Sequence, residues 1–280
     1  MNSSVPTVLL SDGTPVSALG LGTWHMGESM RRRPREAAAL AAGIALGMTL
    51  IDTAEMYGDG GAEEVVGDAI AGRRDRVFVV SKVYPHNAGA KAAIAACERS
   101  LRRLRTDRLD LYLLHWRGRV PLAETVDAFE RLRHHGKILR WGVSNFDVDD
   151  MRELLALPDG RHCAANQVLY HLGERGAEWA LARLCRAHGI PFMAYCPLGE
   201  GGLLHDRRLR AIAKGIDASP AQVALAWLIA RGAIAIPKSA DVDHLRENSA
   251  AAMLALSAAT LANIDAAFPP PSHPTSLGVI

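Results

Sequence analysis

The feature of this sequence that most restricts its fold is a regular alternation between short apolar runs and amphipathic segments. Eight runs are rich in aliphatic and β-branched residues and have the length of buried strands, at 19–23, 49–53, 77–83, 109–115, 138–145, 163–168, 191–197 and 233–239. Nearly continuous apolar runs are typical of parallel strands that are covered on both faces. Eight such strands alternating with eight helices predict an α/β fold, a closed (β/α)8 TIM barrel rather than an open sheet.

The segments around these runs carry signals of their own. Residues 121–135 place four apolar side chains on one helical face, with Pro121 suited to the first position. Ser219 to Gln222 form a capping box that opens another helix. Residues 8–18 predict a small β-hairpin around an Asp-Gly turn, which we expect to close the bottom of the barrel. An extra C-terminal helix is predicted near 257–267.

Composition excludes several classes of protein. The chain has 280 residues, 49% of them hydrophobic, and a formal net charge of +2, so it can bury a large core and is not disordered. The near balance of 32 basic and 30 acidic residues gives no electrostatic footprint for nucleic acid. No shift in composition marks a boundary, so residues 1–280 are predicted to form a single barrel domain.

The cysteines and the N-terminus indicate the compartment. There is no C-x-x-C pair and no motif of metal ligands, so we expect neither disulfides nor a metal site. The first ten residues lack the basic and apolar regions of a secretory signal, and the longest uncharged stretch, 37–51, is too short to span a membrane. We therefore expect a cytoplasmic protein without a membrane or nucleic-acid partner. A monomer is favoured, and an oligomer is left open.

Polar side chains recur at the C-terminal ends of the predicted strands. In a barrel these ends converge on one mouth, where active sites are built. A structural ion pair would explain Asp52 and Lys82 alone, but nearly every strand contributes a polar residue. The residues are Asp52 with Tyr57 in the following loop, Lys82, His115, Ser144, Asn145, Gln167, Tyr195, Lys238 and Ser239.

These residue types point to proton transfer. A phenol close to an ammonium and an imidazole has its charged form favoured, so Tyr57 is expected to have a lowered pKa and to donate a proton near neutral pH. Asp52 is expected to pair with Lys82, because a buried ammonium without a partner is costly. No nucleophilic serine or cysteine accompanies them. Reduction of a carbonyl, with hydride from a cofactor, is one reaction that needs such a proton donor.

The same residues lie in motifs that resemble those of the aldo-keto reductases. The motifs include LIDTAEMYG at 50–58, LLHW at 113–116, GVSNF at 142–146, AYCPL at 194–198 and IPKS at 236–239. The resemblance covers essentially the whole chain, and residues 52–67 and 109–116 look most like the short bacterial methylglyoxal reductases. It implies that Tyr57 is the general acid, that Lys82 lowers its pKa, that Asp52 holds Lys82, and that His115 orients the carbonyl.

The resemblance also implies a nicotinamide coenzyme. Tyr195 matches the aromatic residue that stacks on the nicotinamide ring, and three polar residues match those that bind its carboxamide, Ser144, Asn145 and Gln167. Further coenzyme contacts are expected from Gly22, Thr23, Cys196 and Leu198. The segment 198–203 is expected to receive the pyrophosphate on its backbone amides. Cys196 stands where a serine is common, as either a harmless replacement or an oxidation-sensitive thiol.

The last strand and the helix after it match the phosphate end of the family's coenzyme site. Lys238 and Ser239 correspond to contacts with the adenosine 2′-phosphate, and two residues correspond to contacts with the adenine, Glu247 and Asn248. His244 departs from the arginine of many relatives, and a neutral imidazole cannot form a bidentate pair with phosphate. Because Lys238 and Arg246 remain nearby, NADPH is favoured over NADH.

Three aromatic residues beyond strand ends match the apolar lining of the substrate pocket, Trp24, Tyr84 and Trp116. The segment 117–120 is short where relatives of narrow specificity insert a long loop. The sequence thus predicts NADPH-dependent reduction of aldehydes and small dicarbonyls such as methylglyoxal. One alternative is an NADPH-binding regulatory partner that senses redox state and turns over slowly. Another, a phosphate-binding isomerase, leaves Tyr195 and Gln167 unexplained.

Overall fold

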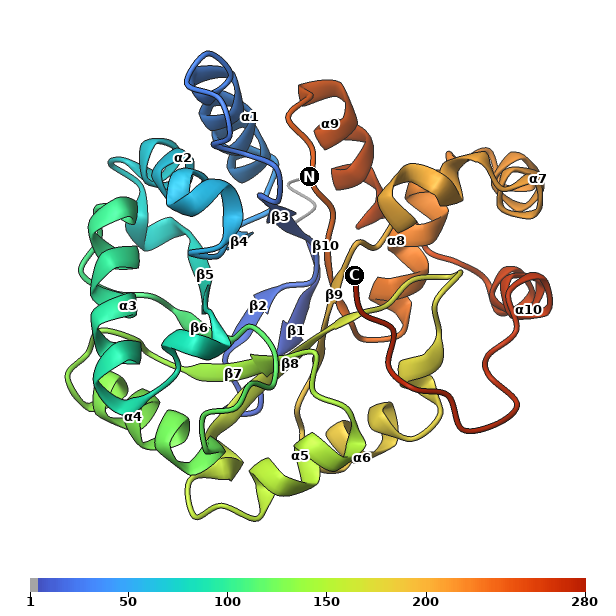
Figure 1. Cartoon of the computed structure of the whole chain (residues 1–280). Coiled ribbons are helices and arrows are strands. Elements are labelled where there is room, and N and C mark those ends of the chain that lie inside the picture. Colours follow the sequence, from blue (N-terminus) through green and yellow to red (C-terminus); the bar gives the residue numbers. More distant parts are fainter. Residues whose placement is uncertain (1–4) are drawn as a thin grey trace.

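The chain folds into a ring of parallel strands surrounded by helices (Figure 1). The computed structural model describes residues 5–280, so Met1 to Ser4 of the segment considered as a secretory signal lie outside it. The barrel strands are β3 (Gly20–Gly22), β4 (Leu50–Asp52), β5 (Phe78–Val83), β6 (Leu111–Leu114), β7 (Trp141–Ser144), β8 (Cys163–Leu169), β9 (Phe192–Tyr195) and β10 (Ile234–Ile236). All eight predicted strands are therefore confirmed.

The strands pair in chain order, and every pairing is parallel. Two isolated bridges join β10 back to β3, Leu19 with Ala235 and Gly22 with Lys238, and they close the ring. The predicted TIM barrel is confirmed. Consecutive strands place their C-terminal ends at the same mouth, as the fold requires.

Ten α-helices in the described part of the chain surround the barrel. They are α1 (Arg33–Ala45), α2 (Gly61–Ile70), α3 (Ala90–Leu104), α4 (Leu122–His134), α5 (Val148–Leu155), α6 (Leu181–Ala187), α7 (Arg207–Gly215), α8 (Pro220–Ala230), α9 (Val242–Ala251) and α10 (Ala258–Ala267). The count exceeds the predicted alternation because both α7 and α8 connect β9 to β10 and α10 follows the barrel. Pro121 is the N-cap of α4 rather than its first residue, whereas the capping box of Ser219 and Gln222 is confirmed.

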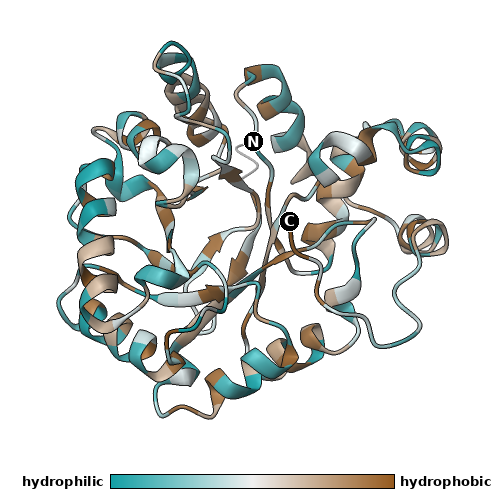
Figure 2. Cartoon of the chain, viewed as in Figure 1, coloured by the Kyte–Doolittle hydropathy of each residue, from teal (hydrophilic) through white to brown (hydrophobic). Residues whose placement is uncertain are grey.

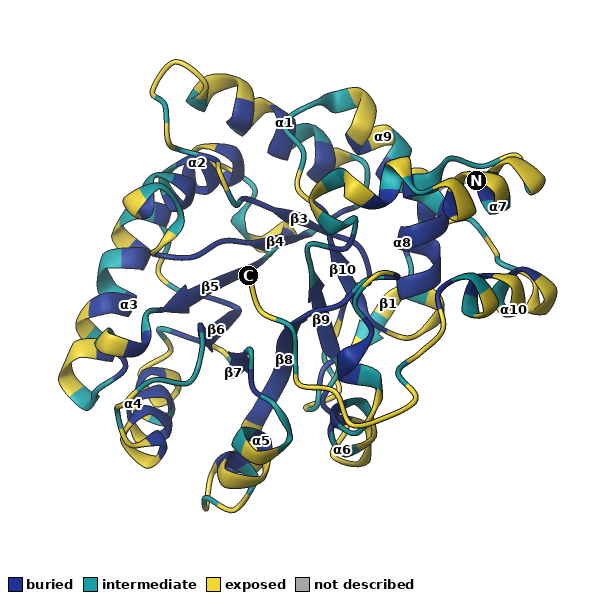
Figure 3. Ribbon diagram, turned by 45° about the vertical axis from the view of Figure 1, so that its right-hand side comes forward, coloured by how far each residue is buried: buried dark blue, intermediate teal, exposed yellow. Residues whose placement is uncertain are grey.

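Two apolar layers stabilise the barrel. Side chains inside the ring form one cluster, and a larger cluster lies between the strands and the helices. Strands are buried along their length, while helices bury their inner faces and expose their outer ones (Figure 3). The outer faces are correspondingly hydrophilic (Figure 2). None of the helices in residues 5–280 combines the length and apolar character needed to cross a bilayer.

The two ends of the chain cover opposite ends of the barrel. Strands β1 (Thr7–Leu9) and β2 (Pro15–Ser17) form the predicted hairpin, and Ser11 Oγ in its turn donates to the carbonyl of Cys163 at 2.8 Å, at the start of β8. Leu10 and Val16 join the interior cluster, so the hairpin closes the bottom as expected. After α10 the chain returns across the mouth, and its C-terminus lies near the centre of the ring (Figure 1).

Candidate active site

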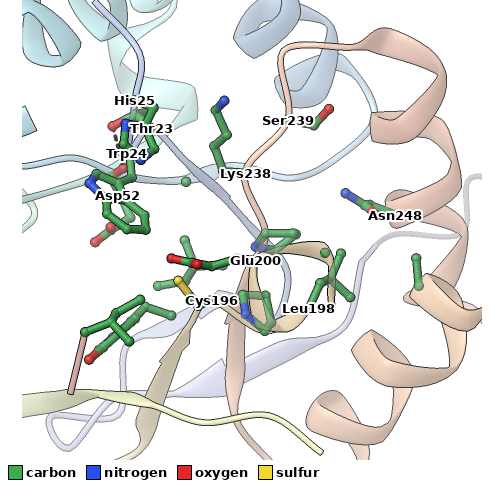
Figure 4. A pocket seen from close by; sticks show the side chains of 18 of the residues that line it. Thr23, Trp24, His25, Asp52, Cys196, Leu198, Glu200, Lys238, Ser239 and Asn248 are labelled. Atoms are coloured by element: carbon green, nitrogen blue, oxygen red, sulfur yellow. Dashed lines mark hydrogen bonds between the residues drawn. The ribbon is translucent and has the colours of Figure 1, made fainter. Parts of the chain in front are cut away.

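A large cavity of about 1390 Å³ occupies the mouth of the barrel. Nearly all the predicted site residues line it: Gly22, Thr23, Trp24, Asp52, Tyr57, His115, Trp116, Ser144, Asn145, Gln167, Tyr195, Cys196, Leu198, Lys238, Ser239, His244, Glu247 and Asn248. Two do not, because Lys82 is completely buried behind the wall and Tyr84 lies behind Trp116. In Figure 4, Asp52 and Trp24 lie well apart from Ser239 and Asn248, so the cavity is elongated.

Lys82 contacts two of the other side chains expected to carry the chemistry, Asp52 and Tyr57. Its Nζ lies 2.8 Å from Asp52 Oδ2, 3.0 Å from the carbonyl oxygen of Thr53 and 3.1 Å from Tyr57 Oη. Strand geometry explains the placement, because Lys82 is two residues beyond Val80, which faces the barrel interior, and alternate residues face the same side. The predicted pair of Asp52 and Lys82 is thus present, with the phenol in contact.

The pKa of Tyr57 runs opposite to the sequence-based expectation. Burial raises the pKa of this phenol above its ordinary value, and the lowering by the neighbouring Lys82 ammonium does not compensate. The expectation of a lowered pKa is therefore wrong for the chain alone, because it counted the charge and not the burial. For Lys82, burial disfavours the ammonium, but the attraction of Asp52 and then of Tyr57 outweighs it and raises the pKa.

His115 is a neutral imidazole next to this group. Burial, and then the nearby Lys82 charge, lower its pKa to about 2. Its Nδ1 is buried and has no partner among the described residues. The ring lies edge-on to Tyr57, with centroids 5.8 Å apart. A neutral histidine between a phenol and an aromatic wall can donate one hydrogen bond to a ligand oxygen without adding charge.

A network of polar side chains continues along the mouth from the carboxylate. Gln167 Nε2 donates to Asp52 Oδ1 at 2.7 Å, and Ser144 Oγ donates to the backbone carbonyl oxygen of Gln167 at 3.0 Å. Tyr195 Oη donates to Asn145 Oδ1 at 2.9 Å. Asn145 has a positive φ of 59°, in the left-handed region that asparagine tolerates better than most residues. The four residues expected to bind a nicotinamide are therefore brought together and fixed from three strand ends.

Aromatic and aliphatic side chains form part of the cavity wall. Trp24 and Trp116 line the cavity, as predicted, and Val279 and Ile280 of the C-terminal segment line it as well. Tyr84 packs edge-on against Trp116, with centroids 5.9 Å apart, and so supports the wall from behind. Sequence reasoning missed the C-terminal pair, because a segment without regular structure gives no periodic signal of where it returns.

The middle of the cavity is formed by the loop after β9 and by helix α7. Leu198, Glu200 and Gly201 line it, in a segment where Gly201 has a φ of 89° that favours glycine. Burial raises the pKa of Cys196 to about 11, so at neutral pH it is a thiol of low reactivity. Sequence reasoning missed two cations that also line the cavity, Arg210 and Lys214 of α7. Their spacing of four residues on one helical face was the available signal.

The far end of the cavity lies between β10 and α9. Lys238 points away from Cys196 and Glu200 in Figure 4. Asp241 caps α9 and accepts hydrogen bonds from the backbone N–H groups of Asp243 and His244, at 2.9 and 3.3 Å. Arg246 pairs with Asp243 at 2.6 Å and does not line this cavity, so the structure does not bring it to the residues expected to bind the phosphate.

One group of potential metal ligands lies far from this mouth. Glu130, Asp159 and His162 bring one ligand atom each within 4.8 Å of one another. The Glu130 carboxylate already accepts hydrogen bonds from Trp141 Nε1 at 2.6 Å and from Arg133. The absence of a metal site remains a prediction of the sequence.

Comparison with known proteins places the chain in a family. The model of the aldo/keto reductase family matches residues 18–268. The chain is 53% identical to methylglyoxal reductase YeaE of Escherichia coli, over 98% of each chain, and 36% identical to glyoxal reductase of Bacillus subtilis, over 93% of this chain and 92% of the relative. It superimposes with a TM-score of 0.95 on an aldo-keto reductase from Klebsiella pneumoniae in complex with NADPH, at 53% identity, covering 98% of this chain and 99% of that one. The chain therefore belongs to the aldo/keto reductase family.

Proposed function

We propose that this protein is an NADPH-dependent reductase of aldehydes and small dicarbonyls such as methylglyoxal. One observation carries the proposal. A buried ammonium contacts both a buried carboxylate and a phenol, and the carboxylate and phenol line a cavity whose far end carries an exposed lysine. Two relatives named for methylglyoxal and glyoxal reduction, and a structure of a relative with NADPH, support it.

The donor set of the cavity fits the coenzyme. A nicotinamide needs a flat aromatic neighbour and partners for its carboxamide, which Tyr195, Asn145 and Gln167 offer at one end. A 2′-phosphate needs cations and hydroxyls, which Lys238 and Ser239 offer at the other. Between them, a Cβ added at Gly201 would meet no atom within 4 Å, so its backbone is open to an approaching phosphate.

When bound, the coenzyme supplies the hydride that turns a carbonyl carbon into an alcohol carbon. The chain's residues handle the oxygen. Tyr57 carries its proton at neutral pH, since the ordinary pKa of a tyrosine is about 10 and burial raises it further, so a proton is present for donation to the substrate oxygen. Lys82, 3.1 Å from the phenol oxygen, stabilises the phenolate that remains after the proton has moved to the substrate oxygen. His115, being neutral, adds a hydrogen bond to that oxygen.

The mouth favours small carbonyl substrates. The segment between Trp116 and Pro121 is short, and the Arg117 side chain holds it by donating to the carbonyl oxygens of Gly118 at 2.7 Å and Val120 at 3.0 Å. Val279 and Ile280 add aliphatic side chains to the aromatic lining that Trp24 and Trp116 provide. We infer that the preferred substrates are short aldehydes and dicarbonyls rather than steroids or sugars.

The proposed setting is the cytoplasm. All four cysteines are free, and three of them are buried, which suits a reducing compartment. A single domain is proposed with it, supported by the one continuous barrel sheet, and the monomer stays a prediction of the sequence.

Steady-state assays with a panel of carbonyls test the function. The loss of NADPH absorbance is followed with methylglyoxal, glyoxal and bulky aldehydes, in parallel with NADH and with no substrate. We expect turnover with NADPH that is fastest for small dicarbonyls. NADPH binding without consumption across the panel would instead identify a coenzyme-binding regulatory protein, and no NADPH binding would contradict the proposal altogether.

A further inference from the structure

A second, smaller cavity of about 380 Å³ opens beside the far end of the large one. The two cavities share three wall residues, Lys238, Ser239 and His244. A ligand group that reaches these residues from the large cavity therefore borders the small one. The remaining wall of the small cavity includes two arginines, Arg35 of α1 and Arg32, the residue just before this helix. Helix α1 packs beside α9: Arg35 near its start lies 3.7 Å from Asp241 at the start of α9, and at the other ends of the two helices Ser249 Oγ donates to the carbonyl of Leu46 at 3.2 Å.

The arginines at the start of α1 differ in their partners. Arg33 pairs with Glu64 and, at 2.6 Å, with Asp68, on the side facing α2. Arg32 lies 3.4 Å from Glu28 and 3.8 Å from Glu36.

Arg35 is 75% exposed, and its only acidic contact among the described residues is Asp241 Oδ2, at 3.7 Å. That separation is a loose pairing, because charge-assisted hydrogen bonds are about 2.7–2.9 Å long. Arg35 is thus the cation of α1 whose guanidinium remains available at the shared wall.

The backbone N–H groups at the start of α9 cannot replace the hydrogen bonds to phosphate that an arginine at position 244 would donate. The Asp241 carboxylate accepts the N–H groups of Asp243 and His244, so these amides are not free to bind an anion. The same carboxylate places a negative charge beside the shared wall, and this charge would repel a phosphate. A cation that neutralises Asp241 and offers a planar fork to phosphate oxygens resolves both problems.

From this arrangement we infer that Arg35 binds the 2′-phosphate of NADPH together with Lys238 and Ser239. Arg35 then takes the role of the arginine that many relatives have at position 244, where this chain has histidine. The inference rests on the proposed function. It makes the phosphate site a composite of the β10–α9 connection and of α1, an outer helix some 200 residues earlier in the chain. Coenzyme preference then depends on the position of α1 against α9 as well as on the local loop.

Binding constants of two coenzymes test the inference without relying on activity. Dissociation constants of NADPH and NADH are measured by fluorescence titration for the wild type, Arg35→Ala and Arg35→Glu. We expect Arg35→Ala to weaken NADPH binding about 3- to 10-fold, because an exposed charge-assisted contact is lost, and Arg35→Glu to weaken it further. NADH, which lacks the phosphate, should change by less than about 2-fold.

Arg246→Ala is the matched control, since this arginine also pairs with an aspartate at the surface, on α9, but lines neither cavity. Its NADPH affinity should stay at the wild-type value. Adenosine 2′,5′-bisphosphate and adenosine 5′-monophosphate, used as competitors, should repeat the NADPH and NADH patterns. Equal losses for both coenzymes, or an unchanged NADPH affinity in Arg35→Glu, would overturn the role of Arg35. A wild type that binds neither coenzyme would instead contradict the proposed function.

Discussion

The two ends of the large cavity differ in the burial of their charged side chains. At the catalytic end Lys82 is fully buried and lies 2.8 Å from a nearly buried Asp52. At the adenosine end Lys238 and His244 are exposed, and the Arg35 side chain is 75% exposed. Buried charges interact strongly and must be paired, whereas exposed ones are screened by water and salt.

This difference in burial indicates where a single substitution should abolish a function and where it should only shift a binding preference. Removing one buried group leaves its partner unpaired, so catalysis should fail on a single substitution. At the exposed end several weak contacts add up, so each substitution should only shift the coenzyme preference. The following experiments test this contrast, beginning with the largest expected effect.

Tyr57→Phe should lower kcat by about 10²- to 10⁴-fold while leaving NADPH binding nearly intact, because only the proton donor is lost and the ring is kept. Rates and NADPH dissociation constants of the two proteins give the comparison. If the variant kept more than about a tenth of the wild-type turnover, the phenol would not be the general acid.

Lys82→Met should reduce turnover severely and also destabilise the fold. The phenolate loses its cation, and Asp52 is left buried without its partner, a change that typically costs about 3–5 kcal/mol. Urea unfolding and steady-state rates measure the two effects. Lys214→Met, at a lysine that lines the cavity from α7, is the control and should leave the free energy of unfolding nearly unchanged. A Lys82→Met protein of wild-type stability would break the linkage between Asp52 and Tyr57.

The buried end was the easier one to predict from sequence. Polar residues that end apolar strands stand out, and the barrel sends them to one mouth, so Asp52, Lys82 and His115 could be grouped without coordinates. The sign of the Tyr57 pKa shift could not be predicted, because it depends on how much water the folded chain excludes.

The exposed end was harder to predict. Arg246 is close to His244 in sequence but faces Asp243, whereas Arg35 is distant in sequence and reaches the site through the packing of α1 beside α9. Only the tertiary arrangement decides which surface cations border a cavity. The four-residue spacing of Arg210 and Lys214 marks one face of the extra helix between β9 and β10, but it does not show that this face lines the cavity.

Acid should weaken the fold through His115. Its pKa is lowered to about 2 by burial and then by Lys82, while in the unfolded chain it returns to about 6.5. Below pH 6.5 the unfolded chain therefore binds a proton that the folded chain does not, and the free energy of unfolding falls as the pH falls. At pH 5 the loss from this one group is about 2 kcal/mol relative to pH 7.5.

Urea unfolding of the wild type and of His115→Asn at both pH values isolates this contribution. The asparagine variant should lose about 2 kcal/mol less between pH 7.5 and pH 5, since it lacks the titrating ring. His171, whose pKa is also lowered by burial, is present in both proteins and cancels. An equal loss in the two proteins would mean that His115 is not held neutral by burial.

Lys238→Ala should weaken NADPH binding by about 10-fold and leave NADH binding nearly unchanged. A hydrogen bond to a charged group contributes about 1.5–3 kcal/mol, and exposure places Lys238 at the lower end of that range. The loss should shrink as salt is raised from low to physiological concentration, because the contact is screened. Equal losses for NADPH and NADH would show that Lys238 does not bind the 2′-phosphate.

The smallest expected effect is a gain. His244→Arg restores a planar guanidinium at the shared wall of the two cavities, where it can pair with phosphate oxygens as the imidazole cannot. If Arg35 already fills this role, the gain in NADPH affinity should be only about 2- to 3-fold in the wild type but larger in the Arg35→Ala background, because a second exposed cation adds little where one is present. Dissociation constants for the two single variants and the double variant form a closed cycle. Identical gains in both backgrounds would mean that the two cations act independently, and the exposed end would then be a set of separate contacts rather than one shared phosphate site.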